Sequence, residues 1–192
     1  MSMQSREYRL LMEAARDPED LATLAIAGVF STSFSRKAPY NVPIYGLRSD
    51  DIFTLMYLHF PDIAEPSAWT VSRIKTPDRV DEFDDLLDLL LRNRSVIDKN
   101  SLWLAHAIAT ASMADDHLWQ DMGLPSRAVL SKLLNTYFTT LAQRNTSDMK
   151  WKKFFYKQLC DEAGINVCRS PSCAECSDYE NCFGSEEHAF IQ

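Results

Sequence analysis

The residues that can do chemistry in this chain are concentrated near its C-terminus, where four cysteines lie within fifteen residues. They are Cys168, Cys173, Cys176 and Cys182, spaced C-x4-C-x2-C-x5-C. Thiolate sulfur is a soft ligand that suits iron–sulfur clusters, zinc and copper(I). Because a proline fixes its own φ and disfavours a helical residue before it, Pro171 predicts an irregular loop here. Such a loop can turn four sulfurs toward one metal centre.

Spacing alone leaves three uses of these cysteines open. The first three repeat the C-x4-C-x2-C run of plant-type ferredoxins, which favours an iron–sulfur centre. Zinc is the main alternative, although structural zinc sites usually combine two separated pairs and only Cys173 and Cys176 form a C-x2-C pair. Disulfides are the third use. The chain shows no signal-peptide segment and no apolar run of ~20 residues, so we expect a soluble cytoplasmic protein, where clustered cysteines usually bind metal.

Composition excludes several other classes of function. The 192 residues are 46% hydrophobic, which is ordinary for a globular protein, and the net charge of −7 argues against nucleic-acid binding. Only five glycines are present, and they are too scattered to form a glycine-rich phosphate loop. No H-E-x-x-H motif and no convincing nucleophile–histidine pair occurs. We therefore do not expect a nucleotide-dependent enzyme.

Hydrophobic periodicity predicts helices along nearly the whole chain. Apolar residues recur at three- and four-residue steps, and no run alternates as a half-buried strand would. The clearest amphipathic pattern predicts a buried face of Val80, Phe83, Leu86, Leu87, Leu90 and Leu91. Two further predicted buried faces are Ile52, Phe53, Leu55, Met56 and Leu58, and Trp151, Phe154, Phe155 and Leu159. We expect Asp17, Ser49 and Asp148 to be helix N-caps and Gly164 to end the last long helix. Helices are predicted over residues 6–16, 17–32, 49–58, 76–91, 100–114, 126–144 and 148–164, with connectors at 33–46 and 61–75. The predicted fold class is all-α, a helical bundle-like domain over residues 1–164 followed by an irregular cysteine-rich metal-binding tail over 165–192.

Two polar stretches of the helical part allow either a structural or a functional interpretation. Residues 115–124 (DDHLWQDMGL) could supply a polar pocket or a metal ligand such as His117. The favoured interpretation is a tight link between helices, with Asp116 as a cap, Leu118 and Trp119 in the core and Gly123 ending a turn. The helix 148–164 carries four lysines on a face that is either simply solvated or able to attract an oxyanion or an acidic partner.

The remaining cysteine and histidines have weaker functional signals. Cys160 lies in the helix 148–164 and is expected to be a small buried hydrophobe rather than a spare ligand. His59 and His106 lie on predicted helices as surface or core residues. His188 follows the last cysteine closely enough to reach a metal centre, but nothing requires it to do so.

Three sequence blocks are distinctive in combination: HLWQDMGL (117–124), NTSDMKWKKFFYKQLC (145–160) and the cysteine tail running into NCFG (181–184). Together they resemble the NifQ family of nitrogen-fixation proteins. The resemblance is most specific over residues 102–184 and extends more weakly to 46–61 and 81–95. Several distinct blocks in the same order, ending in an intact cysteine spacing, make coincidence improbable.

The resemblance implies a role in molybdenum supply. NifQ proteins are regarded as metallochaperones that carry molybdenum in an Mo–Fe–S cluster and donate it, through cofactor assembly scaffold proteins, to synthesis of the iron–molybdenum cofactor of nitrogenase. The implied cluster ligands are Cys168, Cys173, Cys176 and Cys182. Arg169 and the Lys150–Lys157 helix are candidates for attracting molybdate or docking a partner, and no membrane or nucleic-acid partner is expected.

Two alternatives share the same cysteines. In one, a zinc ion stabilises the tail and the helical body is an interaction module. In the other, an iron–sulfur centre serves an electron carrier or redox sensor, which passes electrons rather than metal.

Overall fold

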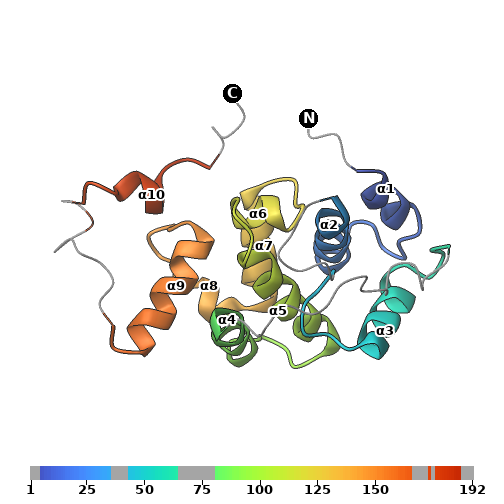
Figure 1. Ribbon diagram of the computed structural model, residues 1–192, viewed down its shortest axis with the longest axis horizontal. Coiled ribbons are helices and arrows are strands. Elements are labelled where there is room, and N and C mark those ends of the chain that lie inside the picture. The colour runs from blue at the N-terminus through green and yellow to red at the C-terminus, as the bar shows by residue number, and fades with distance from the viewer. Residues whose placement is uncertain (1–4, 36–42, 65–80, 166–172, 174–175, 187–192) are drawn as a thin grey trace.

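The structure, a computed structural model, describes residues 5–35, 43–64, 81–165, 173 and 176–186 (Figure 1). Within these residues every regular element is a helix, which confirms the predicted all-α fold. The helices are α1 (Arg6–Glu13), α2 (Leu21–Ser35), α3 (Ser49–His59), α4 (Asp81–Arg92), α5 (Lys99–Ser112), α6 (Leu118–Asp121), α7 (Arg127–Tyr137), α8 (Thr139–Ala142), α9 (Trp151–Glu162) and α10 (Tyr179–Phe183). None of those described is both long and apolar enough to span a membrane.

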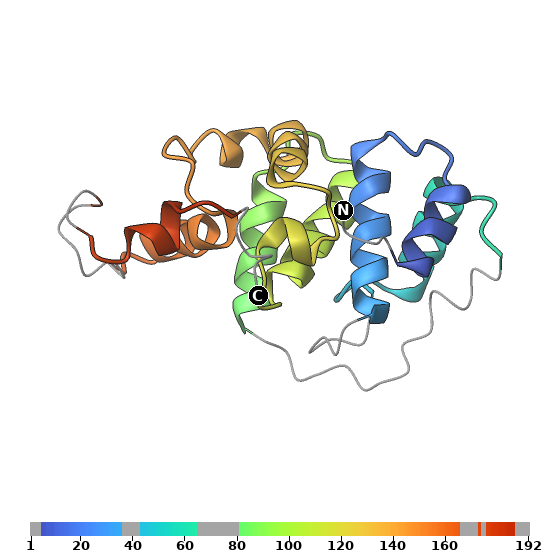
Figure 2. The ribbon, with the colours of Figure 1, turned by 90° about the horizontal axis from the view of Figure 1, so that it is seen from above.

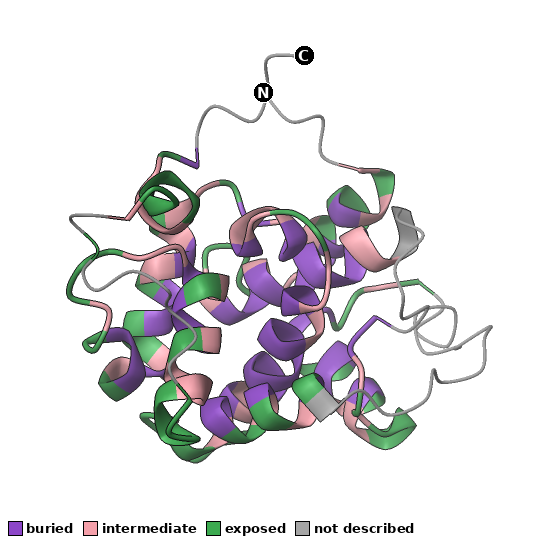
Figure 3. Ribbon diagram, turned by 60° about the vertical axis from the view of Figure 1, so that its left-hand side comes forward, coloured by how far each residue is buried: buried purple, intermediate pink, exposed green. Residues whose placement is uncertain are grey.

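Helix α5 forms the centre of the molecule. Ten of its 14 residues are buried, and it packs against α2 on one side and α4 on the other (Figures 1 and 3). The helix starts one residue earlier than predicted because the Asp98 carboxylate accepts a hydrogen bond from the Ser101 N–H at 2.7 Å. A helix that is buried nearly all round gives the fold a rigid axis. The α1–α3 end and the α9–α10 end lie on opposite sides of this axis (Figures 1 and 2).

The predicted start of α2 is wrong by several residues. The Asp17 carboxylate accepts from the Glu19 N–H at 3.0 Å and so closes a turn before the helix. The carboxylate of Asp20 instead accepts from the Thr23 N–H at 2.9 Å, and α2 begins directly after it. The helix then continues to Ser35, into the stretch predicted as a connector.

Helix α3 lies where a helix was predicted, but its buried face differs from the predicted one. Ile52, Leu55 and Met56 are buried as predicted, whereas Phe53 is 45% and Leu58 36% exposed. Because an α-helix has 3.6 residues per turn, the buried face that contains these three residues continues to His59. Phe53 and Leu58 lie outside that face. Ser49 is the first residue of α3 and not its N-cap, which is Arg48.

The long helix predicted over residues 126–144 is divided at Phe138. This fully buried residue has φ −138° and ψ 46°, outside the helical region, so α7 ends before it and α8 begins after it. Ser95 occupies the break, since its N–H donates to the Tyr137 carbonyl at 2.8 Å and its Oγ accepts from the Thr139 N–H at 2.9 Å. Ser126, where the predicted helix begins, is the N-cap of α7, because its Oγ accepts from the Val129 N–H.

Helix α4 confirms most of the clearest amphipathic pattern in the sequence. Phe83, Leu86 and Leu90 are buried as predicted, with Leu87 and Leu91 partly buried against the core. The predicted start of this helix, residues 76–80, lies outside the described residues, as does most of the 61–75 connector.

Candidate metal-binding site

The turn before α9 directs the backbone of Lys150 toward the cysteine tail. Asp148 has a φ of +53°, so it reverses the chain in a left-handed conformation and is not the helix cap that was predicted. Asn145 closes the turn by accepting from the Met149 N–H at 2.9 Å and donating to the Met149 carbonyl at 2.8 Å. Helix α9 begins after Lys150, its N-cap, and stops as predicted at Gly164, whose φ is +67°.

Helix α9 is fixed on the body by its aromatic face. Trp151, Phe154 and Phe155 are buried, as predicted, and the indole N–H of Trp151 donates to Ser131 Oγ on α7 at 3.1 Å. Cys160 lies half-buried on the same helix, so its predicted burial is only partly correct.

Three of the four predicted cysteine ligands lie in the described part of the tail. Cys173 is exposed, while Cys176 and Cys182 are half-buried. Backbone bonds from the Cys176 N–H to the Cys173 carbonyl (3.3 Å) and from the Tyr179 N–H to the Cys176 carbonyl (3.2 Å) turn the chain into α10. Cys182 therefore lies on a short helix, where an irregular loop was predicted. Tyr179 and Phe183, one turn apart, stack at 4.7 Å between ring centroids and support this helix.

The structure does not assemble a complete metal-ligand set. Cys168, Arg169 and His188 lie outside the described residues. Across the described ranges, no group of three or more His, Cys, Asp or Glu side chains is placed to hold a metal ion. The donors that one short segment supplies are thiols, which fit a soft metal or an iron–sulfur cluster and not the oxygen-seeking Ca²⁺ or Mg²⁺. The four-cysteine ligand set stays a prediction.

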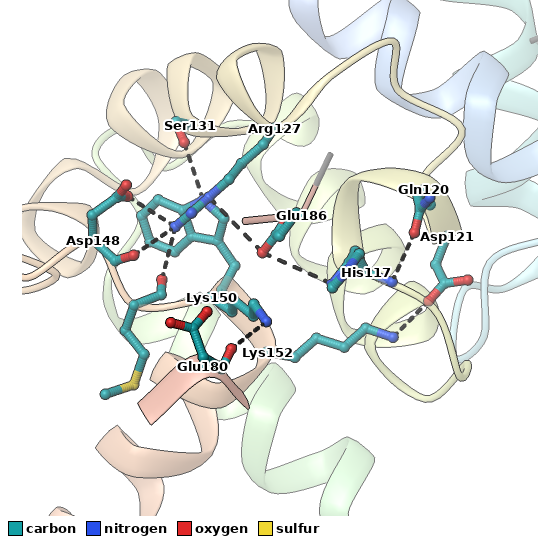
Figure 4. Close-up of polar contacts among 12 residues, drawn as sticks. His117, Gln120, Asp121, Arg127, Ser131, Asp148, Lys150, Lys152, Glu180 and Glu186 are labelled. Atoms are coloured by element: carbon teal, nitrogen blue, oxygen red, sulfur yellow. Dashed lines mark hydrogen bonds and ion pairs between the residues drawn. The ribbon is translucent and has the colours of Figure 1, made fainter. Parts of the chain in front are cut away.

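Helix α10 is attached to the start of α9 by Lys150 (Figure 4). The Lys150 N–H donates to the Cys182 carbonyl at 2.8 Å, and its Nζ donates to the Glu180 carbonyl at 2.8 Å. Gly184 follows the helix and approaches it so closely that an added Cβ would lie 2.6 Å from the Glu180 carbonyl oxygen. The glycine of the NCFG block therefore lets the chain return to the body.

Beyond Gly184, the chain places a carboxylate inside the molecule. The Glu186 side chain is only 5% exposed, and its Oε1 lies 3.9 Å from Arg127 Nε and 3.9 Å from His117 Nδ1 (Figure 4). Arg127 Nε is itself buried and has no hydrogen-bond partner among the described residues. Sequence reasoning missed this contact, because Glu186 falls in the tail that was predicted to be irregular. Nothing local to that stretch indicates a buried carboxylate.

A second buried ion pair lies beside this contact and belongs to the body. Lys152 Nζ lies 2.6 Å from Asp121 Oδ2 and also donates to the Ala114 carbonyl at 2.6 Å. The Asp121 side chain is 1% exposed and that of Lys152 is 17% exposed. The lysine joins α9 to α6 and is therefore not part of a simply solvated face.

Residues 115–124 form the tight link between helices that was predicted, but the residue that caps α6 differs from the prediction. Leu118 is buried, Trp119 is partly buried, and the N-cap of α6 is His117 where Asp116 was predicted. Gly123 ends the turn with a φ of +63° and lies against Gly28 of α2, where an added Cβ would come within 2.7 Å of the Gly28 Cα. Close contact with α2 fixes the direction of α6.

Three of the four lysines of α9 have partners in the structure. Besides Lys150 and Lys152, Lys157 lies 2.6 Å from Asp161 one turn along the helix. Lys153 is exposed. Attraction of an oxyanion or a partner by this helix stays a prediction.

Two further histidines are buried in the core. His59 Nδ1 lies 2.9 Å from Thr23 Oγ1, and its Nε2 lies 3.1 Å from Asn100 Oδ1. His106 Nδ1 lies 3.0 Å from the Tyr45 carbonyl oxygen. Burial lowers the pKa of both histidines, because the charged imidazolium loses its hydration. His59 connects α3 to α2 and α5, and His106 connects α5 to the chain before α3.

Fold and site together define a helical protein with a cysteine segment, here residues 173 and 176–186, docked at one end of its body. Residues 25–184, which include the four cysteines and the three sequence blocks, match the profile of the NifQ family. The chain belongs to the NifQ family, whose members take part in nitrogen fixation and the processing of molybdenum.

Individual relatives support this membership. The chain is 41% identical over 151 residues to Protein NifQ of Azotobacter vinelandii, covering 73% of this chain and 77% of the relative. It is 45% identical over 102 residues to a Protein NifQ homolog of Sinorhizobium fredii, covering 53% of this chain and 44% of that protein. It is 42% identical over 98 residues to Protein NifQ of Rhodobacter capsulatus, covering 51% and 54% respectively. No solved structure matches the chain.

Proposed function

We propose that this protein is a carrier, not an enzyme, which binds molybdenum in an Mo–Fe–S cluster and donates it to iron–molybdenum cofactor synthesis. The proposed ligands are Cys168, Cys173, Cys176 and Cys182. The proposed source of the metal is molybdate, and the proposed receivers are the nitrogenase cofactor assembly scaffold proteins. Family membership supports the context, and the four closely spaced thiols support the cluster.

The observation that carries the proposal is the position of the cysteine segment. It lies at one end of the molecule, with Cys173 exposed, and not inside the helical core (Figure 1). Terminal segments with few contacts open locally at small free-energy cost. A cargo bound there can be received from, and passed to, another protein without unfolding the body.

Anaerobic purification with metal analysis tests the proposal. We expect iron, molybdenum and acid-labile sulfide in the protein, and a visible chromophore. The double variant Cys173→Ala/Cys176→Ala should lose the chromophore and about tenfold or more of the bound metal while helical circular dichroism is retained. Cys160→Ala, on α9, is the matched control and should retain both.

Other results would assign a different function. Zinc as the sole metal would support a zinc-stabilised interaction module, and iron without uptake of molybdenum would support an electron carrier or redox sensor. Either result contradicts the carrier. Loss of the whole fold in the double variant would show that the cysteines have a structural role instead.

A further inference from the structure

We infer that Glu186 is a positioning residue that holds the cysteine segment on the body through a socket formed by Arg127 and His117. Its carboxylate lies 3.9 Å from a nitrogen of each (Figure 4). Carboxylates are almost never this buried unless a cationic group accompanies them, and here the Glu186 side chain is 5% exposed. The burial is therefore a specific contact and not incidental packing of a chain end.

The socket is held in place by the body and not by the tail. Arg127 Nη2 is shared among the Asp148 carbonyl (2.9 Å), Asp148 Oδ1 (2.8 Å) and the Met149 carbonyl (3.0 Å). This leaves its Nε directed at Glu186. On the other side, the Gln120 side chain accepts from the His117 N–H at 3.2 Å. Contacts that do not involve the cysteine segment thus orient the Arg127 side chain and anchor the His117 backbone.

The contact acts on the cysteines through a short connection. Glu186 follows Cys182 by four residues, and only Phe183, the last residue of α10, Gly184 and Ser185 lie between them. Fixing Glu186 keeps the Cys182 carbonyl within 2.8 Å of the Lys150 N–H. The same loop of residues, 145–149, supplies the oxygens that clamp Arg127 and leads directly to Lys150. One loop therefore builds both attachment points of the segment.

The docking of the segment is independent of the proposed function. Its consequence for a metal cargo rests on that function. With Glu186 in its socket, Cys182 is held against α9; without it, the segment keeps the two bonds of Lys150 but loses its contact with Arg127 and His117. Glu186 would therefore set how readily the ligand-bearing segment leaves the body.

Amide hydrogen exchange of the full-length chain tests the docking directly. The Lys150 N–H precedes α9 and donates to the tail carbonyl of Cys182, whereas the Phe154 N–H bonds within α9 to the Lys150 carbonyl at 2.9 Å. Glu186→Gln should accelerate exchange at Lys150 by about fivefold or more, with exchange at Phe154 unchanged. Glu186→Asp, which keeps the charge, should restore part of the protection.

A matched control is available on the far end of α9. Glu162→Gln breaks an exposed ion pair with Arg92 (2.9 Å) and should leave the Lys150 amide unchanged. Unchanged exchange at Lys150 in Glu186→Gln would overturn the inference. Equal acceleration at Lys150 and Phe154 would also overturn it, because it would indicate general destabilisation. Failure of the proposed function would appear in the metal analysis and leave this exchange result intact.

Discussion

The body and the cysteine segment both contain a buried carboxylate opposite a basic side chain, but the two contacts differ in closeness. In the body, Asp121 and Lys152 meet at 2.6 Å, and the lysine also donates to a backbone carbonyl. In the segment, Glu186 lies 3.9 Å from its two basic partners, beyond hydrogen-bond distance. The first contact locks two helices of the body together. The second holds a segment that can still separate.

This difference explains how a small protein can have a rigid body and still release one segment. The body is built round α5, whose burial leaves few ways to open locally. The segment adds only α10 and the turn that returns at Gly184, and it meets the body mainly at Lys150 and Glu186. Opening the segment breaks few contacts, whereas opening the body breaks the core.

The largest effect is expected from breaking the body's ion pair. Asp121→Ala leaves the Lys152 ammonium buried without its carboxylate, and the free energy of unfolding should fall by about 3–5 kcal/mol. Chemical denaturation measured by circular dichroism gives this value. The double variant Asp121→Ala/Lys152→Ala should recover part of the loss, because no uncompensated charge remains.

The exposed pair of α9 provides the comparison. Asp161→Ala removes the partner of Lys157, and the expected cost is about 0.5 kcal/mol or less. If Asp121→Ala costs no more than Asp161→Ala, the closeness and burial of the body's pair do not stabilise it, and the contrast between the two regions is lost.

Acidification should weaken the body through its buried histidines. Burial lowers the pKa of His59 and His106 below the ordinary 6.5, so the unfolded chain binds protons that the folded chain does not. Their contribution is fully present above pH 6.5 and is lost as the pH falls below it toward the lowered pKa values of the folded state. Denaturation midpoints at pH about 7.5 and about 5.5 measure the slope. A shallower slope in His59→Gln would assign the effect, while greater stability at the lower pH would contradict it.

A small and local effect is expected from the side-chain bond of Lys150. Lys150→Met removes the Nζ bond to the Glu180 carbonyl but keeps the backbone N–H, so local opening of the segment should become easier by about 0.5–1 kcal/mol. Exchange of the amide at position 150 should accelerate a few fold, with the melting temperature unchanged. Lys157→Met is the matched control on the same helix. A fall in global stability would show that this lysine belongs to the body.

Sequence reasoning predicted the fold well because local signals determine most of it. Periodic apolar residues located the helices, and Gly164 and Gly123 stop their elements with the left-handed φ that glycine permits. The predictions were wrong where contacts between residues distant in sequence determine the local structure. Phe138 leaves the helical region while fully buried, and Ser95, distant in sequence, satisfies the backbone at that break. Nothing near residue 138 indicates this partner.

The candidate site was likewise only partly predictable from the sequence. The cysteines are recognisable from spacing and from the family, and that ligand set stays a prediction. Glu186 and Arg127 could not have been found, because a buried ion pair between distant residues leaves no periodic pattern. Asp148 was predicted to cap a helix because aspartate often does, but its left-handed conformation instead orients the clamp on Arg127.

The backbone bond from Lys150 to Cys182 bears on how the chain can be divided. The leading N–H groups of a helix have no partner within it, and the tail carbonyl serves the residue that opens α9. A shortened chain that stops after α9 would expose this amide to water and remove Glu186 from between Arg127 and His117. The cysteine segment thus completes the last helix of the body, and excising it should loosen the very surface on which it rests.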